Sequence, residues 1–150
     1  MQRALRFTLS VCCMVLAAGF IGCGSKLPVP SERLPGKWHG EMIVYEETQA
    51  KMPPEIVTRL AQTQYDFEFR PDGTMALSGV ESGQAYTSEG RWQALKQDGD
   101  LMTIKSTENS GKEKDINIEF DGKDTFYIPV AAPVQFGAAE LGAMRFTRLR

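Results

Sequence analysis

Histidine and cysteine are scarce in this chain of 150 residues, and their scarcity limits the chemistry that it can perform. His39 is the single histidine, and the three cysteines are Cys12, Cys13 and Cys23. One imidazole cannot complete a zinc site without several further ligands. The sequence also lacks the Gly-x-Ser-x-Gly and His-Glu-x-x-His motifs. We therefore expect a non-enzymatic protein with no catalytic residue, metal or cofactor, and we interpret His39 as a surface residue.

The chain also has no excess of basic side chains over acidic ones. The chain has 17 Lys and Arg residues against 19 Asp and Glu residues, for a net charge of −2. A protein that binds nucleic acid or an anionic membrane surface neutralises phosphates with clustered Lys and Arg side chains. We therefore expect neither of these as an electrostatic partner.

The apolar run over residues 7–22 is too short for a membrane-spanning helix. It has about 16 residues, whereas a spanning helix needs roughly 20. Arg3 and Arg6 precede the run and small residues end it, an order that is typical of a secretory signal peptide. The alternative is an uncleaved membrane anchor. We predict that residues 1–22 are a cleaved signal peptide and that the protein is exported.

The end of this run, Phe20-Ile21-Gly22-Cys23, resembles the lipobox of bacterial lipoproteins. The resemblance implies cleavage after Gly22, a diacylglycerol on the Cys23 sulfur and an N-linked acyl chain such as palmitate. It departs from the usual lipobox at Phe20, where Leu is common. The alternative is a soluble exported protein with an unmodified thiol. Gly24 in place of Asp resembles outer-membrane sorting, so we expect attachment to the cell envelope, at the outer rather than the inner membrane.

Cleavage would leave Cys23 as the one remaining thiol, so no internal disulfide could form and the fold would depend on its core. Without Arg3 and Arg6, 15 basic and 19 acidic residues remain, a net charge of −4. Two or three acyl chains would hold the protein stably in a membrane. Residues 23–33 are rich in proline and predict an extended, semi-rigid tether. Residues 34–150 then form one domain, which we expect to be monomeric.

Hydrophobic residues alternate along most of this domain, as in half-buried β-strands. The clearest runs are residues 64–70 and 114–120, shorter ones occupy residues 125–128 and 144–148, and residues 86–95 and 101–105 complete the series. Asp-Gly pairs at residues 72–73, 98–99 and 121–122 separate these runs and are strong hairpin signals. The predicted fold is all-β, an antiparallel meander of about eight strands that closes into a small barrel.

The segment Met52–Gln62 interrupts the alternation. Prolines begin it, and Ile56, Val57 and Leu60 have helical spacing. We predict one short helix between the first and second strands. It could plug one end of the barrel or act as a lid over a cavity.

The opening of the domain resembles lipocalins and small lipocalin-like lipoprotein domains. Gly36-Lys37-Trp38 matches their Gly-x-Trp motif, and the Phe-x-x-Asp-Gly-Thr pattern of residues 69–74 and the terminal Phe146-Thr-Arg148 also resemble that group. The resemblance implies that Trp38 closes one barrel end and that an Arg of the last strand lies across its ring. We assign that role to Arg148, with Arg145 as the alternative.

Large inward-facing side chains could either fill such a barrel or line a ligand site, because eight strands enclose little space. These residues are Tyr65, Phe67, Phe69, Met75, Tyr86, Trp92, Met102, Phe120 and Phe126. We expect binding of a small apolar ligand. The alternative is a filled barrel that acts as a structural or protein-interaction module of the cell envelope, with the apolar stretch 129–137, interpreted as a loop, as its first candidate surface.

Overall fold

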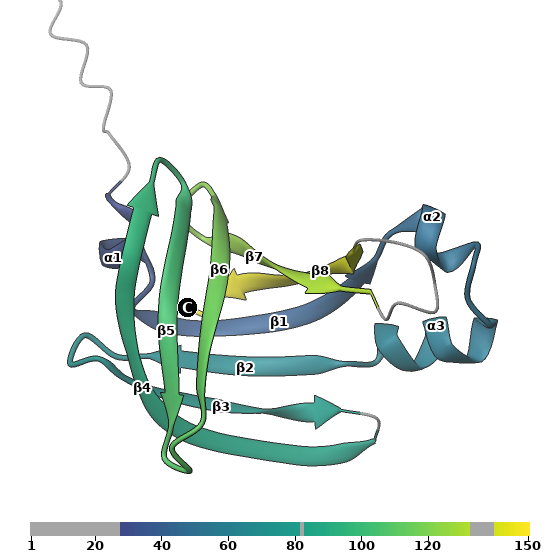
Figure 1. Cartoon of the computed structure of the whole chain (residues 1–150), viewed down its shortest axis with the longest axis horizontal. Helices are drawn as coiled ribbons and strands as arrows, with labels where there is room; N and C mark the ends of the chain where they lie inside the picture. Colours follow the sequence, from purple (N-terminus) through teal and green to yellow (C-terminus); the bar gives the residue numbers. More distant parts are fainter. Residues whose placement is uncertain (1–27, 82, 133–139) are drawn as a thin grey trace, which may run out of the picture.

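Eight antiparallel strands form a closed barrel in the computed structural model, which describes residues 28–81, 83–132 and 140–150 (Figure 1). Each strand pairs with the next along the chain, and the last pairs with the first. The predicted all-β meander is therefore confirmed. The strands are β1 (Gly36–Val44), β2 (Gln64–Phe69), β3 (Thr74–Glu81), β4 (Gln84–Asp98), β5 (Leu101–Glu108), β6 (Glu113–Asp121), β7 (Thr125–Ala131) and β8 (Glu140–Arg148).

The hairpin turns follow from the sequence. Gly73, Gly99 and Gly122 have φ angles of +81°, +58° and +68°. Residues with a Cβ disfavour positive φ angles, and the Asp-Gly pairs place a glycine where the turn requires one. Inward residues on paired strands lie opposite one another, for example Trp38 beside Phe67. The alternation therefore sets which face of each strand becomes the core.

Three helices accompany the barrel in the described part of the chain: α1 (Pro30–Arg33), α2 (Glu46–Gln49) and α3 (Pro54–Ala61). The helix predicted between the first two strands is α3, which has a proline at its first position. The one-turn helix α2 precedes it and was not predicted. The extended path predicted for the tether is wrong for Pro30–Arg33, where proline begins a helical turn and Arg33 is held by the barrel.

The two ends of the barrel are built differently (Figure 1). α1, the chain terminus after β8 and the turns that follow β2, β4 and β6 gather at one end, which we call the closed end. α2, α3 and the turns after β3 and β5 belong to the opposite end, which we call the mouth. This division follows from an up-and-down meander, in which alternate connections lie at opposite ends.

The wall is least continuous between β6 and β7. Their register contains three pairs, from Glu119–Tyr127 to Asp121–Thr125, and β7 continues four residues further without a β6 partner. Pro129, in this unpaired stretch, has no N–H to donate, which is tolerated where a strand lacks a neighbour. The loop expected at 129–137 is therefore wrong for 129–131, which belong to β7, and residues 133–137 lie outside the described part.

The predicted signal peptide, Cys23 and most of the tether lie outside the described residues. Among the residues that are described, no helix has the length and apolarity to cross a membrane.

Candidate functional site

The closed end is filled by aromatic rings. Phe126 is completely buried, and its ring centre lies 4.7 Å from those of both Trp38 and Phe146 and 5.6 Å from that of Phe120. Gly40 makes room for this packing, because a Cβ there would lie 2.2 Å from the Phe146 ring. Edge-to-face and offset pairs of this kind are favourable beyond their buried area. These rings therefore pack directly against one another as part of the core.

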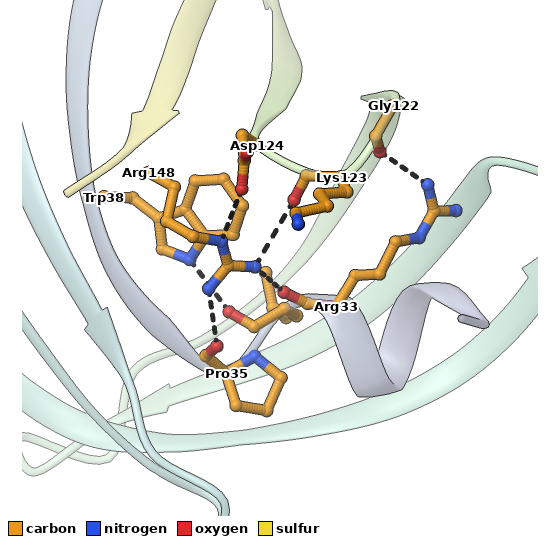
Figure 2. Close-up of polar contacts among 8 residues, drawn as sticks. Arg33, Pro35, Trp38, Gly122, Lys123, Asp124 and Arg148 are labelled. Atoms are coloured by element: carbon orange, nitrogen blue, oxygen red, sulfur yellow. Dashed lines mark hydrogen bonds and ion pairs between the residues drawn. The ribbon is translucent and has the colours of Figure 1, made fainter. Parts of the chain in front are cut away.

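Arg148 covers the Trp38 ring at this end (Figure 2). The guanidinium carbon of Arg148 lies 4.1 Å from the ring centre, in the geometry of a cation–π pair. Its nitrogens donate to the carbonyl oxygens of Pro35, at 3.0 Å, and of Arg33, and Nε lies 3.3 Å from an oxygen of Asp124. The Trp38 indole N–H donates to the Leu34 carbonyl oxygen at 2.8 Å. The alternative residue, Arg145, points outward and pairs with Glu41.

Arg33 is a second buried arginine at the closed end, and the sequence did not identify it. It donates to the Gly122 carbonyl oxygen at 2.6 Å (Figure 2). It also donates to Asp100 at 2.6 Å, and its guanidinium lies 4.5 Å from the Phe120 ring centre. Its Nε is buried without a hydrogen-bond partner. No local pattern around residue 33 marks this role, because every partner is distant in sequence. Arg33 fastens α1 to the barrel.

The mouth is apolar but less completely buried. Inward-facing side chains there pack against the core and remain partly exposed; they are Tyr65, Leu77, Ile116, Ile128 and Val130. Tyr65 lies against Gly79, where a Cβ would approach the Tyr65 ring to 2.5 Å. The closed end is therefore filled by closely packed rings, whereas the mouth has partly exposed apolar side chains beside buried ones such as Val44, Met52 and Leu141.

The candidate lining residues divide between these two regions. Phe67, Phe69, Met75, Met102, Phe120 and Phe126 are buried core residues. Trp92 is partly buried and donates its indole N–H to the Arg70 carbonyl oxygen at 3.1 Å. Tyr65 belongs to the mouth, and Tyr86 is 36% exposed beside the β3–β4 turn. The structure thus brings most of the predicted set into the core and leaves the two tyrosines toward the mouth.

α2 and α3 flank the mouth (Figure 1). Thr48 is completely buried, and its hydroxyl donates to the Glu140 carbonyl oxygen at 3.2 Å. The side-chain amide of Gln49 donates to the Val44 carbonyl oxygen at 2.8 Å. α3 has no fully buried residue, although Ile56, Val57 and Leu60, on one face of the helix, pack against the core. α2 is therefore fastened, whereas α3 rests on the barrel by a half-buried apolar face.

A groove of about 280 Å³ lies on the outer wall, where β6 and β7 separate. Its lining residues come from four strands and mix charges with apolar groups: Lys96, Asp98, Leu101, Thr103, Asn117, Ile118, Glu119 and Pro129. Leu101 is 54% exposed, and the Thr103 hydroxyl donates to Asn117 at 3.0 Å. The groove is therefore a shallow surface feature, separate from the mouth.

His39 lies on the outer face, turned away from Trp38. Its Nδ1 is 2.7 Å from a carboxylate oxygen of Asp66, and the two side chains are 41% and 56% exposed. Both side chains are therefore accessible to solvent, as expected for His39 as a surface residue. Within the same residues, no group of three or more His, Cys, Asp or Glu side chains is arranged to hold a metal ion.

Comparison with known proteins adds little beyond the architecture. No family model matches the chain, and no curated protein matches its sequence. A solved structure described as a redesigned beta barrel is similar at 15% identity, with a TM-score of 0.49, over 84% of this chain and 100% of that one.

Proposed function

We propose that this protein is a non-enzymatic, lipid-anchored module of the bacterial cell envelope whose barrel binds a small apolar ligand at its mouth. The observation that carries the ligand site is the partial exposure of the inward-facing apolar side chains there. A ligand that covered them would remove apolar surface from water, which is worth about 25 cal/mol per Å². The buried aromatic residues of the closed end offer no such gain.

The side chains at the mouth also suit a small apolar ligand in their chemistry. Leu77 on β3 and Ile128 and Val130 on β7 are partly exposed and pack against the core. Ligand sites of this kind are concave and mostly apolar, with few polar groups. The ligand class that suits this lining is a compact hydrocarbon or aromatic group, because the lining offers few partners to a charged one.

The envelope location is proposed from the sequence at Cys23. A signal peptide followed by Phe20-Ile21-Gly22-Cys23 supports lipid attachment. Cys23→Ala should leave the protein in the soluble fraction or unprocessed, whereas the wild type should fractionate with membranes and yield a lipid-modified N-terminal peptide by mass spectrometry. A processed Cys23→Ala protein that still fractionates with membranes would refute attachment at this residue.

The ligand site can be tested with the neutral fluorescent probe N-phenyl-1-naphthylamine. Leu77 and Val80 lie on the same strand, but Leu77 points inward and Val80 points outward, where it is 45% exposed. Leu77→Gln should weaken probe binding by at least about tenfold, equivalent to about 1.4 kcal/mol. Val80→Gln, the matched control, should leave the affinity unchanged. Equal affinities of the two variants, or no probe binding by the wild type, would contradict a ligand site at the mouth.

A second candidate function is protein interaction at the outer groove. It is favoured by the exposed Leu101 and by the unpaired stretch of β7 that contains Pro129. Leu101→Asp should then abolish capture of an envelope partner without changing probe affinity, whereas Leu77→Gln should do the reverse. A partner that binds both variants as it binds the wild type would count against the groove.

A further inference from the structure

We infer that the closed end of the barrel faces the membrane and that the mouth opens away from it, toward the aqueous side. This inference rests on the proposed lipid attachment at Cys23. It follows from where the chain is fastened to the barrel and from the few residues that separate this point from the anchor.

The segment from Ser31 to Pro35 is held firmly at the closed end. The Ser31 amide donates to Gln97 at 3.1 Å, and Arg33 reaches the turns after β4 and β6 through Asp100 and Gly122. Trp38 and Arg148 bind the carbonyl oxygens of this same segment from within the barrel (Figure 2). These bonds to Trp38 and to three distant regions of the chain fix where the N-terminal segment leaves the domain.

The remaining connection is short. Five residue steps separate Cys23 from Pro28, the first described residue, so even a fully extended chain spans at most about 18 Å. Pro28 itself is exposed at the closed end, next to α1. The lipid-bearing residue therefore cannot reach the opposite end of the barrel.

The barrel is longer than this connection. β1 runs from the closed end to the mouth and has nine residues, which corresponds to a strand length of about 30 Å. A tilt of about 35–45° to the barrel axis reduces that to roughly 21–25 Å along the axis. A rotation that brought the mouth to the bilayer would require the short connection to pass around the whole domain.

Attraction to lipid headgroups does not supply this orientation. The turns at the closed end carry Asp72, Asp100 and Asp121 as well as Lys123. An anionic bilayer would gain little from this mixture of charges. The restraint is therefore the tether, and it should be insensitive to salt. A ligand in the mouth would then be exchanged with the aqueous phase or with a facing partner, rather than drawn from the membrane that holds the anchor.

Energy transfer to the bilayer tests the orientation. The lipid-modified protein would be reconstituted into phosphatidylcholine vesicles that contain a headgroup-labelled acceptor lipid. Single donor dyes would be attached at Lys123→Cys, in the closed-end turn, and at Glu47→Cys, on α2 at the mouth. Both positions are exposed, and the Cys23 sulfur is consumed by the lipid, so each variant has one reactive thiol. We expect markedly greater transfer from position 123 than from position 47, both at low salt and at about 0.5 M salt, where the Debye length is well under 10 Å.

A matched tether variant sharpens the result. Insertion of about ten Gly and Ser residues after Ser25 lengthens the flexible connection and should reduce the difference between the two positions. Equal or reversed transfer in the lipid-modified protein would overturn the orientation while leaving the anchor intact. An N-terminal peptide without lipid, found by mass spectrometry of the same sample, would instead overturn the anchor and the orientation together.

Discussion

The two ends of this barrel use the same strands for different purposes. At the closed end, Trp38, Phe126 and Phe146 exclude water from one another, and Arg148 covers them with bonds to the chain that enters the domain. At the mouth, Leu77 and Ile128 have the same inward orientation but remain partly hydrated. We expect from this difference that stability is concentrated at the closed end, and the proposed ligand site is the other end.

The largest expected effect tests whether stability is concentrated in this way. Phe126→Ala should reduce the free energy of unfolding by about 3–5 kcal/mol, because it removes a fully buried ring. Ile128→Ala, two residues further on the same face of β7, should cost about 1–2 kcal/mol, because its side chain is already partly hydrated. Urea denaturation of both variants measures the difference. Equal losses would show that the interior is packed uniformly.

The next effect compares two arginines of β8. Arg148→Ala should cost about 2–3 kcal/mol, because the carbonyl oxygens of Arg33 and Pro35 lose their donor and Trp38 loses its covering cation. Arg145→Ala, the matched control on the outer face, should cost under about 1 kcal/mol, because its pair with Glu41 is exposed to solvent. Thermal denaturation would reveal the contrast, and a larger loss for the Arg145 variant would break the assignment of the closed end.

The smallest effect concerns pH. Asp72, in a closed-end turn, accepts bonds from the hydroxyl and the amide of Thr74, and these bonds lower the pKa of its carboxyl. When the pKa of a carboxyl is lower in the folded state than in the unfolded state, its ionised form stabilises the fold at pH values above the unfolded-state pKa. This stabilisation is lost as the pH falls through the folded-state pKa. Asp72→Asn should therefore be slightly less stable than the wild type at pH 7 and nearly equal to it near pH 2. A stability difference that is the same at both pH values would exclude this linkage.

Much of the barrel was predictable because its signals are local. The alternation in β2 and β6 and the glycines at 73, 99 and 122 determine strands and turns within a few residues. The contacts of Arg33 were not predictable, since Asp100 and Gly122 lie 67 and 89 residues away. The same limit applied to α1, where the prolines suggested an extended chain and tertiary contacts favour a helical turn.

The partial hydration of the mouth also required the structure. The predicted lining set includes Phe67 but not Leu77, although the two residues are opposite each other in the β2–β3 register. In the closed barrel Phe67 is buried, whereas Leu77 is partly exposed. The sequence therefore predicted large inward side chains without the boundary between core and candidate site.

The pairing of β1 with β8 has a consequence for how the protein is made. Every other strand pair joins neighbours in the chain, so those seven pairings can form one after another along the sequence. Closure has to wait for the final residues, because Arg148, 115 residues after Arg33, is the group that binds the entering segment. Formation of these distant contacts should be the slow step of folding. Until then, the segment from Ser31 to Pro35 lacks its bonds to Arg148, so the closed end is completed only when the last strand pairs with β1.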